Sequence, residues 1–311
     1  MLKPLLAAAA FLPALAHGQA ERFYPDDLGQ NGRATLSPGF SPDGSEMFFT
    51  QSDCRTVVRC PQQLFRTQRR GSGWSRPELV AVTAGDRVDW PLYTPDGGSL
   101  LFSWRRQRPR HEGRGVVDDF DLYRWRLDGT EEPEPLDQAD INRVRGGKIA
   151  RLRYVHNESS ASLTEEGDLY FFTERLDEGS GERDVFVARS DGQGGFLEAE
   201  PLPAPINTSA REDNPWVSAD GNTMLLSIDG RLGARRGDLF VFRRKNGKWT
   251  EPQSLGPAVN TAYAEFAGRI TPDGKSLVFT SSRPVEEGEE PILQVWQVPL
   301  ADIPALAFLA D

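Results

Sequence analysis

The sequence predicts an all-β fold, a β-propeller of five four-stranded blades, with six blades as the alternative. Three observations lead to this prediction: a turn motif that recurs five times, a near-constant interval between its copies, and strand-like segments after each copy. The acidic turn residue falls at Asp43, Asp96, Glu166, Asp220 and Asp273, so the intervals are 53, 70, 54 and 53 residues. A period of about 50 residues with several short strands is typical of one propeller blade.

Each copy of the motif predicts a tight hairpin followed by a buried strand. In the first copy, Ser41-Pro42-Asp43-Gly44 precedes the apolar run Met47-Phe48-Phe49-Thr50. Proline presets φ at the first turn position, and Asp-Gly supplies the special conformations of a hairpin turn. A run of four or five apolar residues has the length of a strand buried on both faces. Two copies depart from the pattern, at Glu165-Glu166 and at Ala219.

Two further strands are expected in each unit. The third often follows an aspartate, as in Asp121-Leu122-Tyr123 and Asp238-Leu239-Phe240. The fourth contains or follows an aromatic residue, as in 73–79, 196–202 and 248–255. A lone blade cannot cover its own faces, so the units must pack around a common axis. The last unit lacks a fourth strand, and we expect the segment 23–29 to supply it and close the ring.

Residues 1–20 form a separate segment. Lys3 precedes an apolar stretch of about a dozen residues, and small residues stand at Ala16 and Ala20, which is typical of a cleavable secretory signal peptide. The apolar stretch is shorter than the roughly 20 residues that span a bilayer. The sequence therefore predicts a periplasmic or secreted protein whose residues 21–311 form a single propeller domain, with an insertion at about 130–155.

The charge balance limits the expected partners. The chain has 36 Lys and Arg against 46 Asp and Glu, a formal charge of −10. Nucleic-acid-binding proteins carry a basic footprint, so nucleic acid is not an expected partner. No segment reaches the length of a membrane span. We expect a monomer that binds an envelope protein or a small polar ligand.

The sequence lacks the fingerprints of metal and cofactor chemistry. It contains no Gly-x-Ser-x-Gly, His-Glu-x-x-His, phosphate-binding loop or dinucleotide motif. It has three His residues, one of them in residues 1–20, so a multi-His metal site is excluded and no cofactor is expected. Cys54 and Cys60 are expected to form a disulfide in an exported protein, with free thiols or a metal pair as the alternatives.

The repeated segment, Ser-Pro-Asp-Gly followed by an apolar run and later by Asp-Leu-Tyr or Asp-Leu-Phe, resembles the PD40 (WD40-like, TolB-type) propeller repeat. The resemblance covers about residues 30–300. It implies a propeller in the bacterial cell envelope that acts as a protein-interaction scaffold. It indicates the fold strongly and the function weakly.

The strongest candidate site is a set of acids that stand seven or eight residues before the acidic turn residue. They precede the inner strand of four repeats, so we expect them to gather at one end of the central channel. Basic residues after the apolar run are expected as partners at the same end, with two tryptophans near the mouth. The candidate ligand-binding residues are Asp89, Glu158, Glu212, Asp213, Glu265, Arg105, Arg175, Arg283, Trp90 and Trp216.

Two interpretations of these acids remain open. They either pair with arginines as part of the framework, or line a pocket for a cation, a sugar or a peptide. We predict a non-enzymatic cell-envelope scaffold that binds a protein or ligand at one end of the channel. The alternative is a carbohydrate-active enzyme, of glycoside hydrolase or lyase type, that uses an axial ring of carboxylates. Retaining glycoside hydrolysis requires two carboxylates about 5 Å apart. No residue is assigned a catalytic role.

Overall fold

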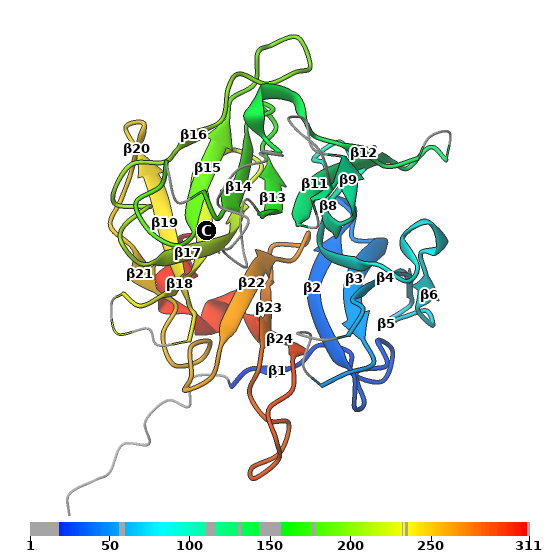
Figure 1. Ribbon diagram of the computed structural model, residues 1–311. Coiled ribbons are helices and arrows are strands. Elements are labelled where there is room, and N and C mark those ends of the chain that lie inside the picture. Colours follow the sequence, from blue (N-terminus) through cyan, green and yellow to red (C-terminus); the bar gives the residue numbers. More distant parts are fainter. Residues whose placement is uncertain are drawn as a thin grey trace, which may run out of the picture.

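The computed structural model describes residues 19–55, 60–109, 116–117, 119–129, 132–142, 157–175, 178–231, 233 and 236–309. Five antiparallel sheets are arranged around a central axis in chain order, which makes a five-bladed β-propeller (Figure 1). The predicted fold class is confirmed, with five blades. Residues 1–18 of the expected signal peptide and most of the expected insertion lie outside the described residues.

The first two blades are built from strands in the stretch from β2 to β12. Blade 1 consists of β2 (Ala34–Phe40), β3 (Glu46–Ser52), β4 (Gln63–Arg70), β5 (Gly73–Trp74) and β6 (Glu78–Leu79). Blade 2 consists of β7 (Arg87–Tyr93), β8 (Ser99–Arg105), β11 (Phe120–Arg126) and β12 (Glu134–Pro135). A small hairpin of β9 (Arg108–Pro109) and β10 (Val116–Val117) lies between β8 and β11 in the chain. Short 3₁₀ helices occur at Ala81–Thr83 and Gln138–Asp140.

In every blade the strands are given in order from the axis outward, so the first is the inner strand and the next is the second strand. The other three blades follow this order. Blade 3 consists of β13 (Glu158–Leu163), β14 (Leu169–Thr173), β15 (Asp184–Ala188) and β16 (Glu200–Pro201). Blade 4 consists of β17 (Arg211–Val217), β18 (Thr223–Asp229), β19 (Asp238–Lys245), β20 (Lys248–Trp249) and β21 (Gln253–Ser254). Blade 5 consists of β22 (Glu265–Ile270), β23 (Ser276–Ser281), β24 (Gln294–Pro299) and β1 (Glu21–Arg22). The chain then forms 3₁₀ helices at Leu300–Asp302 and Pro304–Leu309.

The ring is closed by the N-terminal strand. β1 pairs antiparallel with β24, and the Phe23 N–H donates to the Val295 carbonyl at 2.9 Å. The closing strand therefore begins slightly earlier than the segment 23–29 that the sequence indicated. The residues after β1 contribute to the core instead, because Phe23 and Leu28 are buried between blades 5 and 1.

The hydrophobic core lies between the blades rather than within one central mass. Each of the five buried clusters draws side chains from two neighbouring blades, the last from blades 5 and 1. In one of them, Leu225 and Leu239 of blade 4 pack against Phe279 of blade 5. This arrangement explains why the apolar runs of the second strands are buried on both faces, since each faces a neighbour on either side.

Every inner strand contains a bulge at an equivalent place. The pairing with the second strand shifts register there, and one residue adopts a left-handed backbone, φ 52–56°. The five residues are Ser37, Trp90, Ser160, Asn214 and Ala267. Hydroxyls at the ends of the apolar runs, within the second strands, bind the adjacent backbone of the next blade. For example, the Ser160 N–H donates to Ser103 Oγ at 3.1 Å, and the Ser37 N–H donates to Thr280 Oγ1 at 3.0 Å. These bonds account for the polar residue that ends most of the apolar runs.

The recurrent turn motif is held by its own hydroxyl and carboxylate. Ser41 Oγ donates to Asp43 Oδ1 at 2.7 Å and accepts from the Glu46 N–H at 2.9 Å. The hydrogen bonds that Asp43 accepts, from the Ser41 hydroxyl first and then from the Ser45 N–H and hydroxyl, lower the pKa of Asp43 to about 2. The turns of blades 2, 4 and 5 repeat the hydroxyl–aspartate pair. The motif therefore serves the architecture of the hairpins.

Replacing Ala219 by proline is expected to raise the free energy of unfolding by about 0.4–1 kcal/mol, because it restricts the unfolded chain at a position where three other turns already carry proline. Glu165→Pro is the matched control. The Glu165 N–H donates to the Ala219 carbonyl at 2.8 Å, so proline there removes a bond between blades 3 and 4 and is expected to cost about 1 kcal/mol. Urea denaturation of both variants measures the difference. Equal effects of the two substitutions would contradict this explanation.

Cys54 and Cys60 lie in the connection between β3 and β4. They are joined by a disulfide with their Cα atoms 6.1 Å apart.

Candidate functional site

The predicted acids lie near the starts of four inner strands, each with side-chain or backbone partners. Glu158 begins β13, and its side chain is fully buried. Arg175 Nε donates to Glu158 Oε1 at 3.1 Å, and Thr173 Oγ1 donates to the same oxygen at 3.0 Å. Arg175 is itself fully buried and donates to the carbonyls of Asp140 and Ile141. Burial raises the pKa of Glu158 well above its ordinary value, although Arg175 opposes the shift.

Glu212 and Glu265 share a different arrangement. Each accepts from the backbone N–H and the hydroxyl of the threonine four residues earlier, Thr208 and Thr261 respectively. Arg283 Nη2 lies 3.2 Å from Glu265 Oε1. Burial raises the pKa of Glu212. Sequence reasoning missed this role of the two acids. The Thr-x-x-x-Glu spacing, which is visible in the sequence, could have indicated that these acids organise the loop before the inner strand.

Arg231, which was not among the candidates, is the cation beside Glu212. Its Nη1 lies 3.6 Å from Glu212 Oε1 and donates to the carbonyl of Pro205 at 2.9 Å. Arg175, Arg231 and Arg283 thus follow the second strands of blades 3, 4 and 5 and bind both a glutamate and a backbone carbonyl. The predicted pairing of repeat acids with arginines is present in these blades.

The two aspartates are also engaged. Asp213 Oδ2 accepts from Arg183 Nη1 at 2.6 Å, and this arginine also binds Glu174. Asp89 accepts from the Trp90 N–H at 2.8 Å and from Gln62 Nε2 at 3.3 Å. Burial raises the pKa of Asp89 to about 6.

The remaining candidates separate from one another. Arg105 lies at the end of β8, half-buried and opposite Arg87 in the sheet. Trp90 makes edge-on contacts with Phe120 and Phe172, at centroid distances of 6.0 and 5.8 Å. Trp216 lies near the far end of β17, where it lines a pocket that none of the other nine candidates lines.

This pocket lies at the end of the channel where the inner strands finish. All five blades contribute to it, and its volume is about 340 Å³. That size falls in the range of small-molecule sites. We call this region the turn end, because the five hairpin turns begin here. Its lining includes Phe40, Ser41, Leu92, Tyr93, Ser162, Leu163, Trp216, Val217, Arg269 and Ile270. The acids occupy the opposite end of the same strands.

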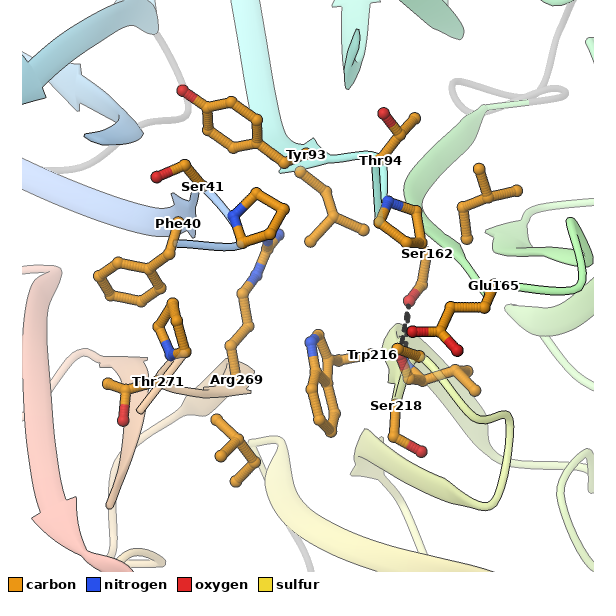
Figure 2. A pocket seen from close by; sticks show the side chains of 18 residues that line it. Phe40, Ser41, Tyr93, Thr94, Ser162, Glu165, Trp216, Ser218, Arg269 and Thr271 are labelled. Carbon is orange, nitrogen blue, oxygen red and sulfur yellow. Dashed lines mark hydrogen bonds between the residues drawn. The ribbon is translucent and has the colours of Figure 1, made fainter. Parts of the chain in front are cut away.

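Arg269 is the charged side chain that projects from β22 into this pocket, beside Phe40 and Trp216 (Figure 2). It is 4% exposed, and its Nη1 donates to the Pro91 carbonyl at 2.7 Å. Among the residues that the structure describes, no carboxylate lies within 4.0 Å of its guanidinium nitrogens. No repeated pattern in the sequence indicated Arg269, because the arginine occurs in one repeat only. The equivalent residues of the other inner strands are Gly39, Leu92, Ser162 and Trp216.

Within the described parts of the chain, no group of three or more His, Cys, Asp or Glu side chains is placed to hold a metal ion. A search of the same residues finds no helix with the length and apolar character needed to cross a membrane.

Comparisons with known proteins address the fold. No protein-family model matches the sequence, and no curated protein matches it. A solved structure of a putative TolB from Agrobacterium tumefaciens is similar with a TM-score of 0.50 and 17% identity, over 85% of this chain and 76% of that one. The chain has the fold of a TolB-type β-propeller. The resemblance inferred from the repeats is therefore confirmed at the level of the fold.

Two further solved structures are similar to this chain. A protein of unknown function from Dyadobacter fermentans has a TM-score of 0.52 and 14% identity, over 93% of this chain and 84% of that one. TolB from Acinetobacter baumannii has a TM-score of 0.48 and 15% identity, over 85% of this chain. The TolB-type propeller described here spans 54% of that protein.

Proposed function

We propose that this TolB-type propeller is a monomeric, non-enzymatic binding protein of the cell envelope that holds its ligand at the turn end of the channel. The observation that carries the proposal is the division between the two ends. The acids at the starts of the inner strands are engaged by arginines, threonines, a glutamine and backbone N–H groups. The turn end has a pocket with aromatic walls and an arginine that has no carboxylate partner among the described residues.

The carbohydrate-active alternative requires a different arrangement of the acids. A general acid and a nucleophile or base must face the scissile bond from two sides. Glu158, Glu212 and Glu265 instead direct an oxygen to a serine or threonine hydroxyl and lie beside an arginine. This engagement favours the framework interpretation. The envelope location rests on the signal-peptide pattern in residues 1–20.

The test compares ligand binding in the wild type and in a variant with a covered pocket. Ala219 lines the pocket at an exposed turn position, so Ala219→Trp is expected to cover the pocket opening without disturbing the blades. Ligand-observed NMR with a defined set of small carboxylates, amines, sugars and short peptides should find ligands that bind the wild type saturably and lose binding in Ala219→Trp. Ligands that bind both proteins equally, or turnover of aryl glycosides that Glu212→Gln abolishes, would overturn the proposal.

A further inference from the structure

Arg269 is a buried cation without an ion-pair partner in the described structure. Its only hydrogen bond there is the one to the Pro91 carbonyl, and its exposed fraction is 4%. Buried charges in proteins are normally paired, because desolvation of a lone ion is costly. Burial lowers the pKa of Arg269 to about 10, and Asp89 acts against the shift from a longer distance. The guanidinium therefore remains charged at neutral pH.

The strand that faces Arg269 is built to accommodate it. Gly39 of β2 lies beside the contact between Arg269 and Pro91. A Cβ atom at Gly39 would come within 2.2 Å of the Pro91 oxygen and 3.3 Å of Arg269 Nη1. Any other residue at this position would push apart β2 and β7. The absence of a side chain at Gly39 thus allows the guanidinium to reach across the channel.

The other polar groups of the pocket are largely committed. Ser162 Oγ accepts from the Val217 N–H at 2.9 Å, and the Ser41, Thr94, Ser218 and Thr271 hydroxyls donate within their own turns. The walls beside Arg269 are formed by Phe40 and Trp216 (Figure 2). The pocket thus offers one buried cationic donor between aromatic surfaces, which suits a ligand with a single anionic group on an apolar body.

The negative charge around the mouth of the turn-end pocket limits the charge that a ligand can carry. The turn residues Asp43, Asp96, Asp220 and Asp273 have lowered pKa values, so they are ionised at neutral pH. Glu165 lines the same mouth and is exposed. These negative charges disfavour the approach of a ligand with several negative charges, whereas a monoanion meets less repulsion.

We propose that the turn-end pocket binds a small organic monocarboxylate, with the carboxylate on Arg269 and the apolar body between Phe40 and Trp216. This inference rests on the proposed function, because it names the ligand class of the same pocket. The chemistry is the charge-assisted pairing of guanidinium and carboxylate, which is stronger than a neutral hydrogen bond and is enhanced by exclusion of water.

Isothermal titration with benzoate and its neutral analogue benzamide tests the proposal. The wild type is expected to bind benzoate at least about tenfold more tightly than benzamide, as one charge-assisted contact would give. Arg269→Gln should weaken benzoate binding by about the same factor and leave benzamide nearly unchanged. The dianion phthalate should bind the wild type more weakly than benzoate because of the acidic mouth.

Two control variants separate charge from folding. Arg269→Lys keeps the cation and should retain part of the preference for benzoate, so the test survives if Arg269→Gln does not fold. Arg76→Gln removes an exposed arginine of blade 1 and should bind benzoate like the wild type. Equal affinity of the wild type for benzoate and benzamide, or undiminished benzoate binding by Arg269→Gln, would overturn this inference.

The outcome also separates the two proposals. If both probes bind equally and Ala219→Trp abolishes both, the proposed function stands and the assignment of a monocarboxylate falls. If neither probe binds the wild type, the monocarboxylate assignment also falls, while the wider ligand screen still decides the proposed function.

Discussion

Arg175→Met is expected to lower the free energy of unfolding by about 3–5 kcal/mol, the usual cost of removing one partner from a buried ion pair. The side chains of Arg175 and Glu158 are both 0% exposed. Methionine fills a similar volume, but it removes the guanidinium that lies 3.1 Å from Glu158 in a desolvated position. Urea denaturation at pH 7 and 25 °C measures the loss. A change below about 1 kcal/mol would contradict the framework role of this pair.

The pH dependence of the same variant has a defined sign. Burial raises the pKa of Glu158 in the folded protein, and loss of Arg175 should raise it further. The folded protein then holds a proton that the unfolded chain releases at a lower pH. Stability is therefore retained at low pH and lost as pH rises through the folded pKa. The deficit of Arg175→Met should be smaller at pH 5 than at pH 8.

A double variant supplies the matched control. Glu158→Leu combined with Arg175→Met removes both charges, so it leaves no uncompensated buried carboxylate. Replacement of buried ion pairs by apolar residues is often neutral or stabilising. The double variant should therefore be clearly more stable than Arg175→Met alone. A double variant as unstable as the single one would indicate that packing, rather than charge, causes the loss.

Removal of residues 21–30 is expected to lower the free energy of unfolding by at least about 5 kcal/mol or to prevent cooperative folding. The deletion exposes the edge of β24 and removes Phe23 and Leu28, which are 3% and 0% exposed. Full burial of each such side chain contributes about 1.5–3 kcal/mol. It also removes Gln30, whose side chain binds the Val295 N–H and the Phe23 carbonyl.

Thermal unfolding with circular dichroism measures this effect. Phe23→Ala keeps the strand and should cost about 3–5 kcal/mol, the range for large-to-small changes in cores. Glu21→Ala changes only an exposed side chain of β1 and should stay within about 0.5 kcal/mol of the wild type. An unchanged melting temperature after the deletion would show that β1 does not close the ring.

The fold could be predicted because its information is local and repeated. Three of the five hairpins carry Pro-Asp-Gly and the other two keep part of the motif, and the interval between copies fixes the size of a blade. The closing strand was located only approximately, because Glu21–Arg22 has no pattern of its own and is defined by pairing with β24. Departures such as Ala219 and Glu165 left the period intact, since the neighbouring blades supply most of the packing.

Of the ten candidate residues, one, Trp216, lines the turn-end pocket of the candidate site. Repetition identified acids and arginines that do lie together, as with Glu158 and Arg175. In a repeat protein, however, residues that recur from blade to blade serve the framework, whereas a ligand-binding residue needs to occur in one blade only. Arg269 occurs in one blade only and reaches Pro91 across the channel, a contact between residues 178 positions apart. No spacing rule along the chain predicts such a contact.

The most direct test of the central claim places Glu212→Gln beside Ala219→Trp in the ligand screen, with the stability of each variant measured in the same samples. Glu212→Gln should lower stability and keep ligand binding, because Glu212 organises the loop at the acid end. Ala219→Trp should keep stability and lose binding. The reverse outcome, in which Glu212→Gln loses binding at unchanged stability and Ala219→Trp still binds, would contradict the assignment of the framework and the ligand to opposite ends of the channel.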